Sequence, residues 1–256
     1  MAAHVPQRTP VGGLMGVSPL RQFILTAMFW LPAMFFVWFA LSSVVAFPVI
    51  RLTGAILLGW MPDLVTSMTQ DYYHALFTYV ADVGGVVGLP STKLAVEEQR
   101  SNVLVYCYGL PLLFGLVMAT PLNWRRTFLQ LGIGFTLLSG MQTFGLLGEV
   151  LKTMAFGVGP AVQAALASME YSAVAPAAGA AAEQHMHAAL ATHGLSLDLI
   201  ALAYQFGYLV LPAVMPVALW ILMNPHFLEA LVGWGGEPEA TPAGPSTGAN
   251  SKGTNA

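Results

Sequence analysis

The sequence predicts an all-α integral membrane protein with four transmembrane helices and a small periplasmic segment, for which a β-strand pair is one interpretation. Composition is the first observation: 56% of the 256 residues are hydrophobic and only 8% are charged, against about 25% charged residues in a soluble domain. The second observation is a set of long windows without Asp, Glu, Lys or Arg. A bilayer core of about 30 Å needs about 20 apolar residues as a helix, because backbone groups in lipid must bond within their own segment.

Charge and cysteine content exclude several function classes. The net charge of -3 comes without a basic patch, so nucleic acid is not a predicted partner. The single cysteine excludes an intramolecular disulfide, CxxC redox chemistry and a cysteine-rich zinc site. No glycine-rich phosphate loop, H-E-x-x-H or G-x-S-x-G motif occurs. Membrane lipid is therefore the expected surrounding, and no cofactor is predicted.

The first predicted span, residues 23–47, follows a cytoplasmic segment of residues 1–22. Its apolar run is far longer than the core of a signal peptide, which has about 7–15 residues, and no small-residue cleavage site follows it. We therefore expect a retained anchor. Pro32 and Pro48 are expected to kink and end this helix, because proline lacks the backbone N–H that a helix needs.

Residues 48–102 are predicted to lie on the periplasmic side. Their first part, 49–60, contains Arg51 and is too short to span, so we expect an interfacial amphipathic segment with Trp60 at headgroup level. Further on, "LVTSMTQDYYHALFTYVAD" and "KLAVEEQR" are separated by a stretch that contains Gly and Pro. Their Thr, Tyr, Val and Phe content favours a small strand pair, although "DYYHALFTYV" also fits a helix.

Spans two and three are predicted at residues 103–120 and 127–147. In the third span, Gly132, Thr136 and Gly140 recur every four residues, and small residues on one face let another helix approach closely. Helix packing is therefore preferred over a ligand contact as the interpretation of this face.

Residues 148–198 form the second predicted periplasmic segment. The charge-free window 153–169 is short and contains Pro160, so we expect an amphipathic helix on the outer surface. If this window spanned instead, the chain would have five spans and an external tail. The Ala-rich remainder predicts a mobile surface excursion with a short helix at about 183–193.

The fourth predicted span, residues 199–223, carries Pro212 and Pro216 one turn apart. Two missing backbone donors imply a kink in which neighbouring groups bond the freed carbonyls. The cytoplasmic tail, residues 224–256, has a composition from about residue 235 that predicts disorder.

Lysines and arginines near the spans set the predicted orientation. Arg8 and Arg21 precede the first span, and Arg125 and Arg126 lie in the short turn between spans two and three. Because positive residues favour the cytoplasm, this turn and both termini are predicted to be inside.

Two polar features near the second span have a functional and a structural interpretation. Cys107 could be a nucleophile, but it lies about a turn inside an apolar run with no histidine near in sequence. A buried packing residue is the preferred interpretation. Glu98 and Arg100 either dock the outer face of another protein or form the solvated edge that commonly precedes a membrane helix.

Three histidines in the Ala-rich segment look like a loose metal cluster. They are His185, His187 and His193, close in sequence to Glu183. On a helix, Glu183 and His187 share a face and His185 does not, so a solvated histidine-bearing loop is preferred and no metal is predicted.

The four spans contain no Asp, Glu, Lys, Arg or His. Proton relays and transporters of charged substrates usually need such a group within the membrane. The polar groups present, Gln130, Gln142 and Gln205, are expected to bond between helices. Just past the third span, Glu149 and Lys152 can pair at i, i+3 as a helix-end pair.

Several stretches together are similar to a known family. They are "LRQFILTAMFWLP" at 20–32, "YGLPLLFGLVMA" at 108–119, "NWRRTFL" at 123–129 and "ALAYQFGYLVLPAVMPVALWILMNPHF" at 201–227. In order and spacing they resemble the exosortase H-associated membrane proteins of Gram-negative bacteria. The resemblance covers the four spans, and the elements "YGLPL" and "AYQFG…LP…P…LW" carry most of it.

The resemblance implies a place in the bacterial inner membrane beside an exosortase, a cysteine transpeptidase-like enzyme that processes proteins with a C-terminal sorting tail. It implies no catalytic residue, because the family has no established catalytic role. Cys107 also lacks the Arg and His partners by which exosortases resemble each other. We therefore expect a non-enzymatic accessory protein that presents or stabilises the enzyme or its substrates.

Two alternatives stay open. One is a membrane-embedded enzyme that uses Cys107 or the three histidines, and the other is a small oligomeric transporter or channel for a neutral or lipidic solute. For the accessory role, the residues expected to dock a partner or to carry the family pattern are Glu98, Arg100, Tyr108, Gly109, Pro111, Arg125, Arg126, Tyr204, Gln205, Gly207, Pro212 and Pro216.

Overall fold

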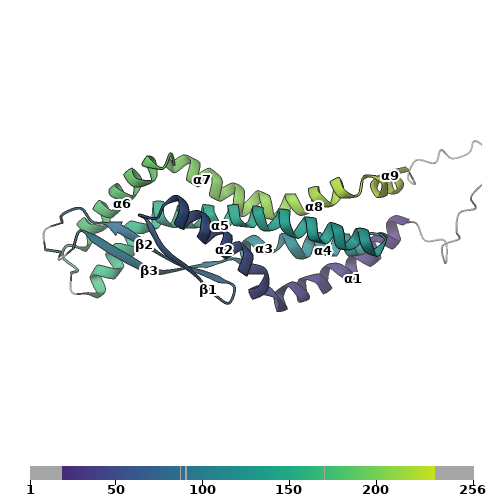
Figure 1. Ribbon diagram of the computed structural model, residues 1–256, viewed down its shortest axis with the longest axis horizontal. Helices are drawn as coiled ribbons and strands as arrows, with labels where there is room; N and C mark the ends of the chain where they lie inside the picture. The colour runs from purple at the N-terminus through teal and green to yellow at the C-terminus, as the bar shows by residue number, and fades with distance from the viewer. Residues whose placement is uncertain (1–18, 87, 90, 170, 234–256) are drawn as a thin grey trace, which may run out of the picture.

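The computed structural model describes residues 19–233, except residues 87, 90 and 170. The described chain is mostly helical with one small antiparallel sheet, and it forms an elongated body (Figure 1). The helices are α1 (Pro19–Ala40), α2 (Ser42–Trp60), α3 (Leu104–Cys107), α4 (Gly109–Ala119), α5 (Trp124–Ser168), α6 (Ala175–Thr192), α7 (Leu197–Gln205), the π-helix η1 (Phe206–Val210), α8 (Leu211–Met223) and α9 (Pro225–Gly233). The strands are β1 (Val65–Asp71), β2 (His74–Asp82) and β3 (Lys93–Asn102).

Helix α5 is the long axis of the molecule. Its 45 residues extend about 68 Å, since an α-helix rises about 1.5 Å per residue. Figure 1 shows it running from the end that carries α9 to the end that carries the sheet and α6. Its first half packs with α4 and α8, and its second half with α6, β2 and β3. We call these two halves of the molecule the bundle and the sheet unit.

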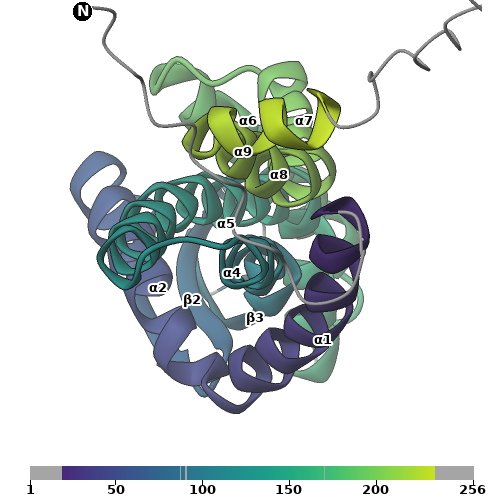
Figure 2. The ribbon, with the colours of Figure 1, turned by 90° about the vertical axis from the view of Figure 1, so that its right-hand side faces the viewer.

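The bundle is built around α4. Viewed along the long axis, α1, α5 and α8 surround this helix (Figure 2), and each of the three contacts it. Both ends of the described chain lie here, because α1 begins and α9 ends at the bundle end (Figure 1). Helix α9 occupies the start of the predicted tail. The disorder predicted from residue 235, like Arg8, falls outside the described residues.

Four helices are long and apolar enough to cross a membrane. They are Leu20–Ala40, Ser42–Trp60, Trp124–Ser168 and Leu197–Met223, with Leu104–Ala119 as a shorter apolar stretch. The mostly helical fold with apolar helices and a small sheet is as predicted. The set of long helices differs from the predicted spans, however. The predicted second span is the shorter pair α3–α4, broken at Tyr108, and residues 42–60 form a long helix of their own.

The first helix ends earlier than expected. The chain turns at Leu41, and Pro48 lies inside α2 instead of ending a helix. Pro48 cannot donate a backbone hydrogen bond to the preceding turn, and close by, the carbonyl of Ser43 accepts one from Gln70 Nε2 at 2.8 Å. This hydrogen bond ties the start of α2 to β1. Residues 49–60, which were expected to form a separate short segment, are the second part of α2.

The predicted strand pair is in fact a three-stranded antiparallel sheet in the order β1-β2-β3. The first stretch expected to be a strand folds into two, because the chain reverses at Tyr72, whose φ of 53° suits a tight turn. Buried and half-buried residues alternate along β2, as a strand with one covered face requires. The helical alternative for this stretch is therefore wrong.

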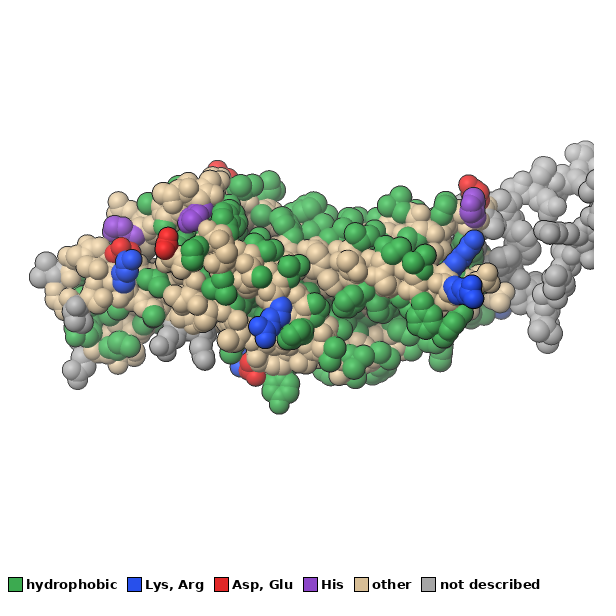
Figure 3. Space-filling model, in the orientation of Figure 1, with side chains coloured by type: hydrophobic (Ala, Val, Ile, Leu, Met, Phe, Trp, Pro, Cys, Tyr) green, Lys and Arg blue, Asp and Glu red, His purple; other side chains and the backbone are tan. Residues whose placement is uncertain are grey.

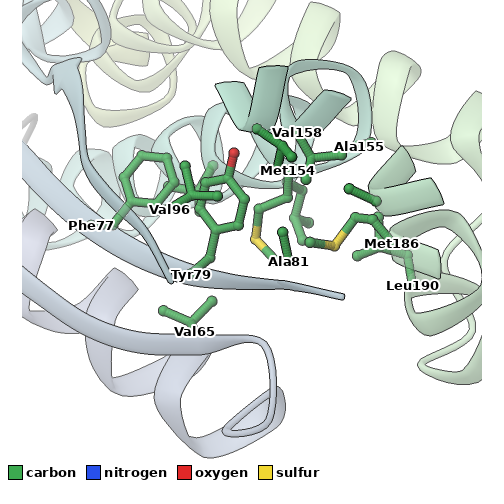
Figure 4. Close-up of a cluster of buried hydrophobic side chains, with 14 of the residues drawn as sticks. Val65, Phe77, Tyr79, Ala81, Val96, Met154, Ala155, Val158, Met186 and Leu190 are labelled. Atoms are coloured by element: carbon green, nitrogen blue, oxygen red, sulfur yellow. The ribbon is translucent and has the colours of Figure 1, made fainter. Parts of the chain in front are cut away.

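One hydrophobic core joins the sheet to α5 and α6. Figure 4 shows the ring of Tyr79 pointing from β2 toward Met154 and Val158 of α5. Met186 and Leu190 of α6 complete this core, and all of these side chains are fully or almost fully buried. The sheet unit therefore has a core of its own, separate from the packing of the bundle.

Residues 153–169 continue α5 to Ser168 and do not form a separate helix on the outer surface. Met154, Val158 and Val162 are fully buried, because the sheet and α6 both pack on this half of α5. The prediction of a surface helix is wrong because the segments that cover this window lie far from it in sequence.

The Ala-rich stretch forms the 18-residue helix α6, which is longer than the helix expected at 183–193. Ala178 and Ala182 are fully buried. Small side chains let α6 approach α5 closely: a Cβ on Gly179 would lie 2.9 Å from the carbonyl oxygen of Gly159. The alanines are therefore a helix-packing surface, and the prediction of a mobile excursion is wrong.

The small-residue face of α5 carries no helix among the described residues. A Cβ on Gly132 or Gly140 would meet no described atom within 4 Å, and Thr136 is exposed. The packing predicted for this face therefore does not occur within the described chain. Close helix contacts instead use other glycines of α5, which belong to the site described next.

Candidate functional site

The two stretches that carry the family resemblance lie against each other in the middle of the molecule. "YGLPL" begins α4, and "AYQFG…LP…P" runs through α7, η1 and α8. Helix α4 contacts α8, and α3, α7 and η1 contact α5. We call this region the helix junction. The structure thus brings together six of the expected residues at one place: Gly109, Pro111, Tyr204, Gly207, Pro212 and Pro216.

Gly109 allows α4 to meet α8. A Cβ at this position would lie 2.8 Å from Cγ of Pro216 and 3.0 Å from the carbonyl oxygen of Pro212. Real Cβ atoms do not approach carbon this closely, so a larger residue would separate the helices. Pro111, two residues further along α4, is buried, and Tyr108, between α3 and α4, is half-buried.

Glycines also bring α5 and η1 into backbone contact. A Cβ on Gly207 would lie 2.7 Å from Cα of Gly145, and one on Gly145 would lie 2.6 Å from the Tyr106 ring. One turn along α5, a Cβ on Gly148 would lie 3.2 Å from the backbone of Tyr204. Small residues at such positions are the usual basis of close helix packing in membranes.

The helix widens where these contacts occur. Residues Phe206–Val210 wind as a π-helix, and the N–H of Leu211 donates to the carbonyl of Phe206. Pro212 follows directly and cannot donate to the preceding turn. Single π-helical turns are frequent at functional sites. The region where Pro212 and Pro216 predict a kink therefore has an irregular backbone that meets α5 at Gly145.

A group of tyrosines and one ion pair joins three helices at the junction. Tyr106 donates to Glu149 Oε2 at 2.9 Å, and Lys152 Nζ donates to Glu149 Oε1 at 3.2 Å. Lys152 Nζ also lies 4.4 Å from the ring centroid of Tyr204, which stacks on Tyr208 at 5.6 Å. Both carboxylate oxygens are engaged, so this group cross-links α3, α5 and α7.

The Glu149–Lys152 pair is confirmed at i, i+3, but its expected place at a helix end is wrong because α5 continues to Ser168. The partners Tyr106 and Tyr204 were not predicted. In the sequence, close helix contacts near Glu149 are indicated by Gly145 and Gly148, which precede it by four residues and one residue. The two glycines do not indicate which helix lies against them.

Cys107 is fully buried, as predicted. Its Sγ lies 3.5 Å from Gln142 Oε1, which is its hydrogen-bond partner. Gln142 thus bonds between α5 and α3, as expected for a polar residue inside a bundle. The other members of its buried cluster are apolar: Ala46, Val49, Ile50, Ala75, Val103 and Leu146.

The expected docking edge lies away from the helix junction, on strand β3. Arg100 forms an ion pair there with Asp71 of β1, and both side chains are more than a third exposed. Leu76 of β2 is the register partner of Arg100, so the pair crosses the open side of the sheet. The structure describes the strand backbone at Glu98, whereas the side chain of Glu98 lies outside what it describes.

Arg125 and Arg126 lie in the first turn of α5, at the bundle end. Near them, Gln130 Nε2 donates to the carbonyl of Met223 at 3.1 Å and to Asn224 Oδ1 at 3.0 Å. The prediction that Gln130 bonds between helices is confirmed, whereas Asn224 was missed. Gln205, for which the same role was predicted, is exposed on α7.

The three histidines have separate surroundings. The ring of His185 lies against Gly84, the His187 Nε2 is 2.7 Å from the carbonyl oxygen of Ala155, and His193 meets the ring of Trp60. Among the described residues no group of three His, Cys, Asp or Glu side chains is placed to hold a metal ion.

The model of the exosortase H-associated membrane protein family matches residues 17–179 and 172–227. The chain belongs to this family. No curated protein and no solved structure matches the chain. The exosortase H-associated match covers both stretches that meet at the helix junction, so the family to which the motifs pointed is confirmed.

Proposed function

We propose that the chain is a non-enzymatic accessory protein of an exosortase-type envelope protein-sorting system in the bacterial inner membrane. Its family is named for association with exosortase H and for the membrane. One observation carries the proposal: the bundle and the sheet unit share the single helix α5, and the sheet unit exposes an edge strand that can receive a partner.

In this proposal four segments cross the membrane: α1, α3–α4, the first half of α5, and α7–η1–α8. Between Arg126 and Glu149, α5 has no charged residue. This stretch is about 35 Å long at about 1.5 Å per residue, close to the thickness of about 30 Å of a bilayer core. On one face of the molecule, hydrophobic side chains likewise separate the charged groups of the bundle end from those of the sheet unit (Figure 3).

The orientation follows from the basic residues. Arg125 and Arg126 are at the bundle end, where α1 also begins and α9 ends. Because Lys and Arg near spans favour the cytoplasm, the bundle end is placed inside and the sheet unit in the periplasm. Both termini are then cytoplasmic, and α2 lies at the outer boundary, against β1 and the middle of α5.

Strand β3 is the proposed docking surface. It has 10 residues and lies at one edge of the sheet. Helix α2 contacts the opposite edge strand, β1, and α5 contacts β3. Among the described residues no strand pairs with the outer side of β3. Free edge strands accept extended peptides by strand addition. The proposed occupant is an extended segment of the sorting enzyme or of its substrate, with the Arg100–Asp71 pair beside it.

The surroundings of Cys107 support a role other than catalysis. A thiolate nucleophile needs a nearby base and an electropositive, accessible site. Cys107 has no exposed surface, and its hydrogen-bond partner is an amide. At the junction, the carboxylate of Glu149 accepts from Tyr106 and Lys152 and so joins helices.

Photo-crosslinking in native membranes tests this proposal. A photoreactive residue is placed at Ala95 or Arg100, both exposed on β3, and at the exposed Thr66 of β1 as the matched control. We expect the two β3 positions to crosslink to an exosortase or a tail-bearing protein, and the β1 position not to do so. Normal processing of tail-bearing proteins after deletion of the gene would contradict the accessory role.

A further inference from the structure

We propose that a groove between α2 and the β1–β2 turn binds the phosphate headgroup of an anionic phospholipid, with Arg51 as the phosphate ligand. The ligand chemistry is a phosphate ester that carries acyl chains. The inference rests on the membrane placement proposed above, and it does not depend on any protein partner.

The groove has room and donors for such a headgroup. Its volume is about 590 Å³, and it is lined by residues of α2 and β1 together with Tyr72 of the turn between β1 and β2. The guanidinium of Arg51 and the hydroxyls of Ser43 and Thr69 provide hydrogen-bond donors, which phosphate oxygens accept. Phe47 and Met68 form the apolar part of the wall.

Arg51 is available for an anion. Its guanidinium carbon lies 5.4 Å from the ring centroid of Phe47, which holds the group at the groove without neutralising it. Among the described residues no carboxylate forms an ion pair with Arg51. The acid nearest in sequence to the groove wall is Asp71, and its partner is Arg100.

The groove lies at the level where headgroups are expected. Ile50, next to Arg51, belongs to the same buried cluster as Leu146 of α5. Leu146 is about 4.5 Å along the helix axis from Glu149, at about 1.5 Å per residue, and Glu149 ends the uncharged stretch of α5. Arg51 therefore lies at the outer boundary of the proposed membrane region, where Arg commonly meets lipid phosphates.

Large apolar side chains are exposed at the end of α1 and the start of α2, close in sequence to the groove, which Val44 itself lines. Phe36 and Phe39 of α1 and Val44 of α2 are 78%, 65% and 68% exposed. Acyl chains attached to a bound headgroup would lie along this surface. A free phosphate would leave the apolar surface uncovered, so the geometry favours a lipid as the source of the phosphate.

Native mass spectrometry of the full chain in mild detergent tests the site. The probes are dioleoyl phosphatidylglycerol, dioleoyl phosphatidylcholine with the same chains, and glycerol 1-phosphate without chains. We expect phosphatidylglycerol to bind more tightly than phosphatidylcholine, and Arg51→Gln to weaken it about tenfold, since a charge-assisted contact is lost. Arg51→Lys should keep part of the binding, because the charge remains.

The control is Lys93→Gln, which removes one positive charge from an exposed residue on β3 and should bind like the unaltered chain. Unchanged melting temperatures would show that the variants fold. Equal phosphatidylglycerol binding by Arg51→Gln and the unaltered chain would overturn the proposal. Displacement of the lipid by glycerol 1-phosphate would overturn the lipid source in favour of a free phosphate ester. No protein partner takes part in this measurement. A negative result would therefore contradict the lipid site alone and would not bear on the docking of a partner at β3, which the crosslinking experiment tests.

Discussion

The burial of Tyr79 makes the stability of the fold depend on pH in the alkaline range. Tyr79 is fully buried in the core of the sheet unit, and among the described residues its hydroxyl has no hydrogen-bond partner. This burial raises the pKa of Tyr79 to about 12, because the charged phenolate is poorly solvated there. The unfolded tyrosine releases its proton near pH 10, so the unfolded state is favoured as the pH rises from 10 to 12.

Tyr79→Phe should therefore act differently at neutral and at alkaline pH. Near pH 7 we expect unchanged stability or a gain of up to about 1 kcal/mol, because an unpaired buried hydroxyl is removed. Between pH 10 and 12 the free energy of unfolding of the unaltered chain should fall by up to about 3 kcal/mol, and that of the variant should not show this fall. Melting temperatures in mild detergent across this pH range measure the difference. Tyr72→Phe, at an exposed tyrosine, should retain the alkaline loss, and an equal loss in Tyr79→Phe would contradict the account.

Cys107 offers a second residue-scale test, through its reactivity. Because the thiol has no exposed surface, a water-soluble maleimide should not modify the folded protein and should modify it fully after denaturation in SDS. Mass spectrometry of the intact chain reads out both states. Rapid labelling of the folded protein would show an accessible thiol and would strengthen the enzyme alternative.

At the scale of elements, glycines of α5 divide into two sets. Gly145 meets η1 at Gly207, whereas Gly140 faces open space among the described residues. Gly207→Ala should therefore separate α5 from η1 and cost roughly 1–3 kcal/mol, as overpacking does. Gly140→Ala is the matched control and should change stability by no more than about 1 kcal/mol in the favourable direction, because alanine is the better helix former. Melting temperatures in mild detergent compare the two, and an equal loss in both variants would show that Gly140 also packs against something.

The same elements show what could be predicted from the sequence. Charge-free windows identified the apolar helices other than α2, because lipid excludes charge over a fixed length; α2 was missed because it contains Arg51. They could not show that α5 runs on to Ser168 or that α6 is buried, because those residues pack against strands and a helix distant in sequence. At the site, the resemblance pointed to Gly109 and Pro216, but only the fold shows that they touch. The Ala-rich composition also suggested a mobile loop, because such segments are often of low complexity. In the structure Ala178 and Ala182 instead form a packed surface, because their side chains are small.

At the scale of the whole molecule, α5 joins two parts that differ in the surface they expose. The bundle exposes large apolar side chains such as Phe29 and Phe128, as lipid contact requires. The sheet unit has its own buried core and carries the exposed strand β3. One continuous helix links the parts. In the proposed function, this helix would hold strand β3 at a fixed height above the membrane, which suits a protein that presents an extended chain to a membrane enzyme.

The proposed orientation predicts which engineered cysteines a membrane-impermeant maleimide reaches in intact cells with a permeable outer membrane. Thr66→Cys lies on the sheet unit and should be labelled from outside. His226→Cys lies on α9, with its side chain 94% exposed, and should be labelled only after the inner membrane is opened. Cys107, being buried, should give little background in either sample. Labelling of His226→Cys alone from outside would reverse the orientation, and labelling of both would mean an odd number of spans. Either result would contradict the proposed arrangement, in which the groove at Arg51 and strand β3 are periplasmic and both ends of the chain are cytoplasmic.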